Sequence, residues 1–296
     1  MQAYGGKWTV LKKQILNEYL TMYSQALKNQ KFNKWYIDAF AGSGYHEFPL
    51  EETNPLFDHT VDEDILELRL GSARLALQHP FDSYIFIEKS LGNFQELEKL
   101  KTEFPEKNIH CIQGDANVEL KQICAQLNKR RRNLRGVVFL DPFGLQLEWE
   151  TLNCIARTEI CDMWYLFPTM GINRMLTRNG HIPDSWENRL NLIMGSTSWK
   201  KVFYEQEEQQ KTFEFILNTD ISLLRKKETP LKNIEEYVNI QLSSIFCYVS
   251  PKPISLYNRH DILFSLFFAA SNRNPKAVNL ASKFGNYILK KYGERT

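Results

Sequence analysis

Trp35-Tyr-Ile-Asp-Ala-Phe-Ala-Gly-Ser-Gly44 combines a short apolar strand with a turn that contains two glycines. The strand ends at Asp38, and the glycines stand at Gly42 and Gly44. A strand that runs into such a turn lets backbone N–H groups approach a ligand at the carboxyl edge of a parallel sheet. The stretch lacks the third glycine of the dinucleotide-binding pattern, so it indicates a nucleotide-type site only together with other motifs.

Acidic residues mark the ends of three further strand-like segments. The segments are Ile85-Phe-Ile-Glu88, Gly114-Asp115 and Phe139-Leu-Asp-Pro-Phe-Gly144. Because the carboxyl ends of parallel strands share one edge of a sheet, we expect these acids and Asp38 to meet there. This arrangement predicts a nucleoside-type cofactor that lies across the edge. The alternative for each acid is a cap on the helix that follows it.

Strand-like and helical patterns alternate along the first half of the chain. Apolar runs without polar alternation, such as Val137-Val-Phe-Leu140, suit a sheet that is buried on both faces. The alternation predicts an α/β fold with a doubly wound, mostly parallel sheet. The predicted strands are 34–40, 83–88, 109–113, 136–140 and 161–167, and the predicted helices are 8–29, 68–78, 91–104, 117–128 and 148–157.

The pattern loosens between Pro168 and about Pro230. This part contains Trp186 and Trp199, and because such aromatic side chains need burial, we predict a helical insertion at 168–230 rather than a linker. The insertion is a candidate for substrate recognition. The other predicted parts are an N-terminal helix in 1–33 that packs on the core and a main domain of 34–167 and 231–296, and the helical pieces of the insertion are expected near 170–178, 183–193 and 206–226.

The last part of the chain reads as a helix at 232–243, an antiparallel pair of strands at 244–249 and 262–270, and a helix at 276–291. Five parallel strands followed by a helix and an antiparallel pair resemble the class I S-adenosylmethionine-dependent methyltransferase fold. The resemblance implies a Rossmann-like, mostly parallel seven-stranded sheet in the order 3-2-1-4-5-7-6, with the helical insertion after strand 5. It also implies S-adenosylmethionine as the cofactor.

S-adenosylmethionine presents an amine, a carboxylate, a ribose diol and an adenine amine, and each of these groups needs a partner. Asp38 and the glycine turn fit the amino-acid end, Glu88 fits the ribose hydroxyls, and Asp115 fits the adenine amine. Glu88 lies much further from Asp38 than the roughly 20 residues of dinucleotide folds, so the segment after Gly44 would be an inserted loop. The candidate cofactor-binding residues are Asp38, Phe40, Ala41, Gly42, Gly44, Glu88, Asp115 and Ala116.

Asp141-Pro-Phe-Gly144 is the candidate reaction centre. It resembles the Asp/Asn-Pro-Pro-Tyr/Phe tetrapeptide of methyltransferases that act on exocyclic amines, and its own form is similar to that of the tRNA guanine-N2 dimethyltransferases. The resemblance implies that Asp141 and Pro142 orient the amine and that Phe143 stacks on the base, because Gly144 replaces the usual aromatic residue. The alternative is an ordinary strand end followed by a turn with a core phenylalanine.

Several motifs together resemble the three-Cys-motif partner protein (TcmP) family. The resemblance implies a bacterial protein whose partner is a three-cysteine-motif protein. The motifs are Lys7-Trp-Thr-Val-Leu-Lys12, Tyr36-Ile-Asp-Ala-Phe-Ala-Gly-Ser-Gly44, Phe86-Ile-Glu88, Gly114-Asp-Ala-Asn117, Phe139-Leu-Asp-Pro-Phe-Gly-Leu-Gln-Leu-Glu-Trp149 and Phe167-Pro-Thr-Met-Gly-Ile-Asn-Arg174.

Two functions remain open at this point. The first is an S-adenosylmethionine-dependent methyltransferase that acts on an exocyclic amine of a nucleic-acid base. The alternative is a non-catalytic or cofactor-gated partner subunit of the three-cysteine-motif protein. Tyr45 and Arg174 are candidate substrate-binding residues. Lys12 is expected to be solvated, unless its helix covers the site and lets it reach the cofactor carboxylate.

The composition is ordinary for a soluble globular protein, with 296 residues, 43% hydrophobic residues and a net charge of +2. No apolar run approaches the roughly 18 residues of a membrane span, and the first residues do not resemble a secretory signal. The five cysteines form no C-x-x-C pair and the six histidines have no ligand-like spacing, so no metal site is predicted. We expect a cytoplasmic protein with reduced thiols.

Overall fold

The computed structural model describes residues 7–44, 71–130, 132–206, 224–227, 231–258 and 261–293. Within these residues the central sheet has eight strands in the order β3-β2-β1-β4-β5-β10-β8, and β9 also pairs with β10. The strands β1 to β5 are parallel to one another, and β10 is antiparallel to β5. The parallel strands are β1 (Asn33–Asp38), β2 (Ser83–Glu88), β3 (Ile109–Gln113), β4 (Leu134–Leu140) and β5 (Cys161–Phe167).

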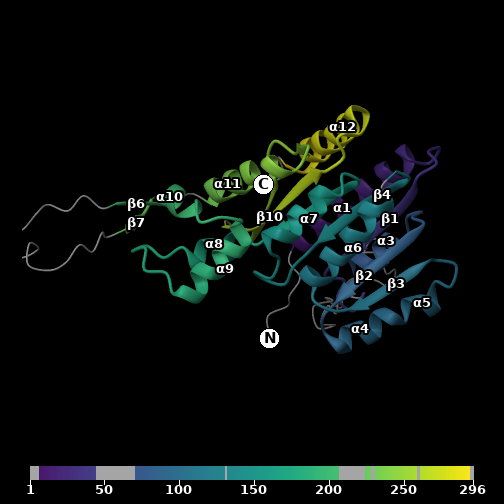
Figure 1. Cartoon of the computed structure of the whole chain (residues 1–296), viewed down its shortest axis with the longest axis horizontal. Coiled ribbons are helices and arrows are strands. Elements are labelled where there is room, and N and C mark those ends of the chain that lie inside the picture. The colour runs from purple at the N-terminus through teal and green to yellow at the C-terminus, as the bar shows by residue number, and fades with distance from the viewer. Residues whose placement is uncertain are drawn as a thin grey trace, which may run out of the picture.

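Successive side chains of the central strands enter two different hydrophobic clusters. Val137 and Phe139 of β4 face one cluster, whereas Val138 and Leu140 face the other. Because both faces are buried, β4 carries apolar residues at the consecutive positions 137–140 instead of alternating apolar and polar ones. Helices therefore cover the sheet on both sides (Figure 1).

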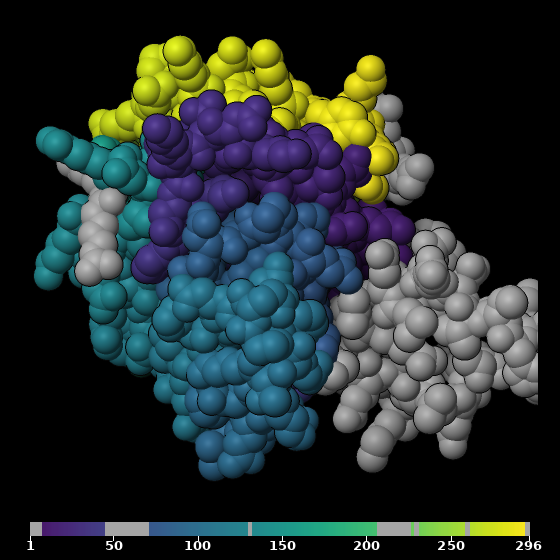
Figure 2. Space-filling model, turned by 90° about the vertical axis from the view of Figure 1, so that its right-hand side faces the viewer, coloured from purple at the N-terminus to yellow at the C-terminus, as the bar shows by residue number. Residues whose placement is uncertain are grey.

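The helices on one face come from the start and the end of the chain. They are α1 (Lys7–Ala26), α3 (Ser72–Leu77), α4 (Leu91–Glu98), α5 (Leu100–Glu103) and α12 (Pro275–Tyr292). The buried ring of Tyr19 in α1 lies 5.4 Å from the ring of Trp164 in β5 and 5.1 Å from that of Phe268 in β10. Figure 2 shows the purple N-terminal segment between the yellow C-terminal helix and the blue residues that follow it in the chain. Burial of these aromatic side chains holds α1 across the sheet.

The opposite face carries α6 (Ala116–Arg130), α7 (Trp149–Arg157) and α11 (Leu231–Ile245). The predicted strand at 244–249 is wrong at its start, because α11 continues through Ile245. Leu242 and Phe246 are both buried and stand one helical turn apart, so burial favours the helix over the strand.

The sheet edge next to β10 is also interrupted. Both β8 (Tyr248–Val249) and β9 (Ile254–Asn258) pair antiparallel with β10 (Asp261–Ala270), which agrees with the predicted hairpin. Pro251 and Pro253 lie between β8 and β9, and proline cannot donate a backbone hydrogen bond to a neighbouring strand. The broken edge strand therefore raises the strand count from the predicted seven to eight.

The segment after β5 forms α8 (Thr169–Met175), α9 (Asp184–Met194) and α10 (Trp199–Phe203), which lie together at one end of the molecule (Figure 1). The predicted helix at 206–226 is wrong at its ends. There β6 (Tyr204–Gln206) pairs antiparallel with β7 (Leu224–Lys226), and residues 207–223 between them lie outside the described part. Of the two tryptophans expected to be buried, Trp199 is fully buried, whereas Trp186 in α9 is 42% exposed, so the expectation is wrong for Trp186.

Candidate functional site

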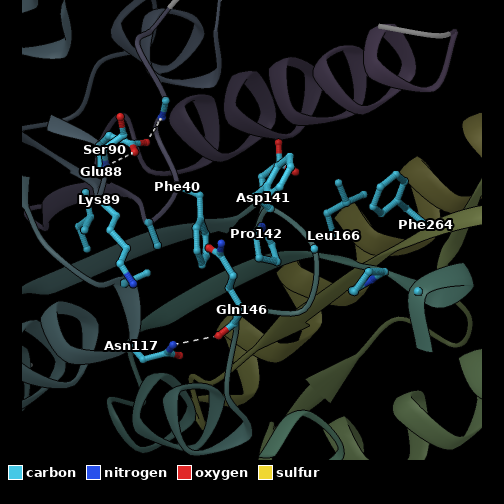
Figure 3. A pocket seen from close by; sticks show the side chains of 18 of the residues that line it. Phe40, Glu88, Lys89, Ser90, Asn117, Asp141, Pro142, Gln146, Leu166 and Phe264 are labelled. Carbon is cyan, nitrogen blue, oxygen red and sulfur yellow. Dashed lines mark hydrogen bonds between the residues drawn. The ribbon is translucent and has the colours of Figure 1, made fainter. Parts of the chain in front are cut away.

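A cavity of about 1050 Å³ lies at the carboxyl ends of the central strands. Figure 3 shows Glu88 and Ser90 on one side of it, Leu166 and Phe264 on the other, and Asp141 between them. We call the side next to β1, β2 and β3 the nucleotide half, and the side next to α1, β4, α8 and β10 the reaction half. The cavity brings together nine of the predicted residues, namely Phe40, Gly42, Glu88, Asp115, Ala116, Asp141, Pro142, Phe143 and Arg174.

The glycine turn after β1 adopts the backbone conformation that its glycines allow. Gly42 has φ +61° and Gly44 has φ +78°, values that other residues rarely adopt. A Cβ atom at Gly42 would meet nothing within 4 Å, so φ rather than crowding requires glycine there. Ala41 and Gly44 are not on the cavity wall: Ala41 N donates to Ile87 O at 3.0 Å, and Gly44 O accepts from Gly71 N at 3.0 Å. These two hydrogen bonds hold the glycine turn against β2 and against the residue that precedes α3.

Glu88 joins the end of β2 to the glycine turn. Its Oε2 accepts a hydrogen bond from Gly42 N at 2.9 Å, and its Oε1 accepts one from Ser90 N at 2.7 Å. Each carboxylate oxygen can accept a second hydrogen bond. The side chain can therefore shape the turn and still bind two hydroxyl groups in the cavity.

Asp115 follows the end of β3 and lines the nucleotide half of the cavity. Its Oδ1 accepts from Asn117 N at 3.0 Å, and its Oδ2 pairs with the exposed ammonium of Lys89 at 3.0 Å. Burial alone would raise the pKa of this carboxyl, but the bonds from Lys89 and Asn117 outweigh burial and lower it. Asn117 in turn holds the loop after β4, because its Nδ2 donates to Gln146 O at 3.0 Å.

Asp38 lies beneath the glycine turn rather than on the cavity wall. Its side chain is fully buried, its Oδ1 accepts from Phe40 N at 3.2 Å, and within the described residues its Oδ2 has no hydrogen-bond partner. Burial, with a further contribution from the charge of Asp141, raises the pKa of Asp38 to about 7, although hydrogen bonds from Ser72 and from Phe40 N act to lower it. A buried acceptor without a partner is suited to a cationic group that approaches from the turn.

The raised pKa of Asp38 predicts a specific pH dependence of stability. Between pH 5 and 8 the unfolded carboxyl, with a pKa near 3.8, is ionised, whereas the folded one still holds its proton up to about pH 7. The free energy of unfolding should therefore fall by about 2 to 3 kcal/mol from this group as the pH rises from 5 to 8. Urea unfolding should show a smaller fall in Asp38→Asn than in the wild type, and the same fall as the wild type in the exposed control Asp184→Asn. Equal pH dependence in all three proteins would contradict the assignment.

Asp141 follows β4 at the centre of the cavity, and α1 supplies its partner. The ammonium of Lys12 donates to Asp141 Oδ2, and Lys12 is only 4% exposed. The prediction of a solvated Lys12 is therefore wrong, because α1 crosses the sheet and carries this side chain into the site. Phe143 is 80% exposed and lines the cavity, so its ring is available to a ligand and is not the core phenylalanine of the alternative reading.

The reaction half contains aromatic residues that were not predicted. The rings of Trp8 in α1 and Phe264 in β10 lie 4.8 Å apart at 37°, and the Lys12 ammonium lies 5.5 Å from the Trp8 ring. The spacing of Trp8 and Lys12, one helical turn apart, was a signal that both face the same side of α1. Nothing local in the sequence indicated Phe264, which reaches the cavity only because β10 lies beside β5.

The remaining predicted residues are placed as follows. Arg174 in α8 is exposed and lines the cavity. Tyr45 lies outside the described residues. Among the residues that the structure describes, no three or more His, Cys, Asp or Glu side chains are grouped so as to hold a metal ion. None of the described helices has both the length and the apolar character needed to cross a membrane.

Comparisons with known proteins give structural neighbours only. No family model matches the chain, and no curated protein sequence matches it. The protein LPL1258 from Legionella pneumophila is 13% identical, with a TM-score of 0.46 over 99% of this chain and 95% of that one. Trm1 from Pyrococcus horikoshii, solved with S-adenosylmethionine, is 14% identical, with a TM-score of 0.37 over 94% of this chain and 58% of that one.

A third neighbour is the N-terminal domain of EvdMO1, solved with S-adenosylhomocysteine. It is 10% identical, with a TM-score of 0.38 over 87% of this chain and 81% of that one. These similarities are low. The class that the described residues define is an α/β protein with a mixed, mostly parallel sheet and a ligand-sized cavity at the carboxyl edge of its parallel strands.

Proposed function

We propose that the chain is an S-adenosylmethionine-dependent methyltransferase of the class I fold that acts on an exocyclic amine of a nucleic-acid base. One observation carries the proposal. A single cavity joins the acidic strand ends at Glu88 and Asp115 to the Asp141-Pro142-Phe143 segment. A cofactor bound in the nucleotide half would thus present its reactive end to a substrate in the reaction half.

The polar groups of the nucleotide half match those of S-adenosylmethionine. The free lone pairs of Glu88 suit the ribose diol, and Asp115 with Ala116 suits the adenine edge. The turn at Gly42 and the buried Asp38 suit the amino-acid end of the cofactor. From beneath the turn, the carboxyl of Asp38 would attract the ammonium group. When bound, this cofactor supplies a methyl group on a sulfonium, which is a good leaving group.

The reaction half supplies orientation rather than a strong base. Asp141 and the carbonyl of Pro142 would accept hydrogen bonds from the two N–H groups of the amine, which directs its lone pair toward the methyl carbon. Phe143 would stack on the base. Lys12 holds the Asp141 carboxylate in place from α1, and the amine can lose its proton after the attack.

A second candidate is a non-catalytic or cofactor-gated partner subunit of a three-cysteine-motif protein. Two observations favour it. Gly144 stands where related tetrapeptides carry an aromatic residue, and the acceptor oxygen Oδ2 of Asp141 is already bonded to Lys12. In this case α1 would have to move before Asp141 could use both oxygens.

Calorimetric titration of the purified protein with S-adenosylmethionine and S-adenosylhomocysteine tests the proposal. We expect micromolar affinity for both, followed by transfer of a labelled methyl group to a base in RNA or DNA. Binding without transfer to any nucleic acid would favour the partner-subunit candidate. If neither compound bound, the titration repeated with the three-cysteine-motif protein present would separate a gated subunit from a chain without this cofactor.

A further inference from the structure

Basic side chains continue from the cavity along the segment that follows β5. We call Arg174, Arg178, Lys201, Lys226 and Lys227 the basic strip; they come from α8, α10, β7 and the residues directly after α8 and β7. Arg174, Arg178 and Lys201 are exposed, and Lys226 and Lys227 are half-buried. Arg174 also lines the reaction half, so the strip begins inside the candidate site.

Hydrogen bonds fix the members of the strip next to one another. Lys226 N donates to Arg178 O at 2.9 Å, and the Lys226 ammonium donates to Asn173 Oδ1 at 2.8 Å and to Leu176 O at 3.1 Å. Lys227 N donates to Phe203 O at 3.0 Å. The last residue of β7 is thus anchored on α8, Lys227 lies beside the end of α10, and the strip is contiguous.

The three exposed members of the strip lack acidic partners among the described residues. Within the described residues, Arg174, Arg178 and Lys201 form no ion pair with an acid, whereas neighbouring Lys200 pairs with Glu187 at 2.5 Å. Burial, and then the charge of Arg178, lower the pKa of Lys226, which indicates like charges at close range. The described residues 168–206 and 224–227 contain eight Lys or Arg and three Asp or Glu, so this part of the chain is enriched in positive charge, whereas the whole chain has a net charge of only +2.

We propose that the basic strip binds the phosphodiester backbone of a nucleic-acid strand whose target base enters the reaction half beside Phe143. This proposal rests on the proposed function and makes it more specific: the substrate is a base within a polynucleotide, not a free nucleoside or nucleotide. A free nucleotide would need one cation near the cavity, at Arg174. The remaining cations lie further along α8, α10 and β7, at the end of the molecule that extends beyond the sheet in Figure 1, where only a longer polyanion can reach them.

The exposed pair Arg178 and Lys201 allows a test that leaves the cavity intact. We would measure the anisotropy of fluorescein-labelled 20-nucleotide single-stranded RNA and DNA with the full chain, with Arg178→Ala/Lys201→Ala, and with the control Lys276→Ala/Lys283→Ala. The control removes the same charge from exposed positions of α12. At about 0.1 M salt, the strip variant Arg178→Ala/Lys201→Ala should bind the oligonucleotide that the wild type prefers about 10- to 30-fold more weakly than the wild type does. The magnitude of the slope of log K against log salt should fall by about 1.4.

The outcomes are distinct. A weaker affinity only in the strip variant, with unchanged circular dichroism and unchanged affinity for S-adenosylhomocysteine, would support the strip, and the RNA and DNA arms would show which strand it prefers. Equal affinities in all three proteins, or displacement of the oligonucleotide by polyglutamate at equal charge concentration, would overturn it. Binding of S-adenosylhomocysteine without binding of either oligonucleotide would reject the strip and leave the cofactor assignment standing. Binding of an oligonucleotide without binding of S-adenosylhomocysteine would reject the cofactor assignment alone.

Discussion

Methyl transfer by Asp141→Ala should be at least about 100-fold slower than by the wild type, while the affinity for S-adenosylhomocysteine stays within about threefold. The expected loss is in orientation, because the carboxylate no longer directs the amine toward the methyl group. The cofactor affinity should persist because Asp141 lies in the reaction half, away from Glu88 (Figure 3). Single-turnover transfer of labelled methyl groups and calorimetry would measure the two effects separately.

The Lys12–Asp141 ion pair determines how this experiment must be controlled. Removing Asp141 leaves the buried Lys12 ammonium without its carboxylate, which typically costs about 3 to 5 kcal/mol. A loss of activity in Asp141→Ala could then reflect unfolding. The double variant Lys12→Met/Asp141→Ala replaces the pair by apolar groups, so urea unfolding should show a stability closer to that of the wild type. Full methyl transfer by this double variant would refute the role of Asp141.

Glu88→Ala should bind S-adenosylmethionine about 100-fold more weakly, or not measurably. Each hydrogen bond to a charged group contributes about 1.5 to 3 kcal/mol, and the variant loses two of them to the ribose diol. It also loses the acceptor of Gly42 N and Ser90 N, so the glycine turn is no longer held against the end of β2. Calorimetric titration would measure the change.

Two further variants control the Glu88 experiment. Glu88→Gln keeps one acceptor oxygen but turns a donor toward a backbone N–H group, so its affinity should lie between those of the wild type and Glu88→Ala. Glu96→Ala in α4 removes an exposed carboxylate that pairs with Lys99 at the surface, and it should bind like the wild type. Wild-type affinity in Glu88→Ala would mean that the ribose does not lie at the end of β2.

Local patterns were sufficient for most of the central sheet. The predicted ranges 83–88, 109–113 and 161–167 coincide with β2, β3 and β5, because their apolar runs are bounded by clear turn residues. Prediction failed where tertiary burial competes with local pattern. The apolar run 244–249 has the composition of a strand, yet its first two residues complete α11. Phe246 follows the helix directly, donates its backbone N–H to Leu242 O and is buried like Leu242.

The acidic residues that close consecutive parallel strands can be recognised from local pattern, and parallel strands necessarily bring their carboxyl ends to one edge. That was enough to place Glu88, Asp115 and Asp141 around one cavity. The partners of these acids, in contrast, depend on how distant segments pack. Lys12 and Asp141 are 129 residues apart, and they meet because α1 packs its aromatic face across the sheet. Asp38 sits under the turn for a similar reason, since burial depends on the helices packed above it and not on its neighbours in the chain.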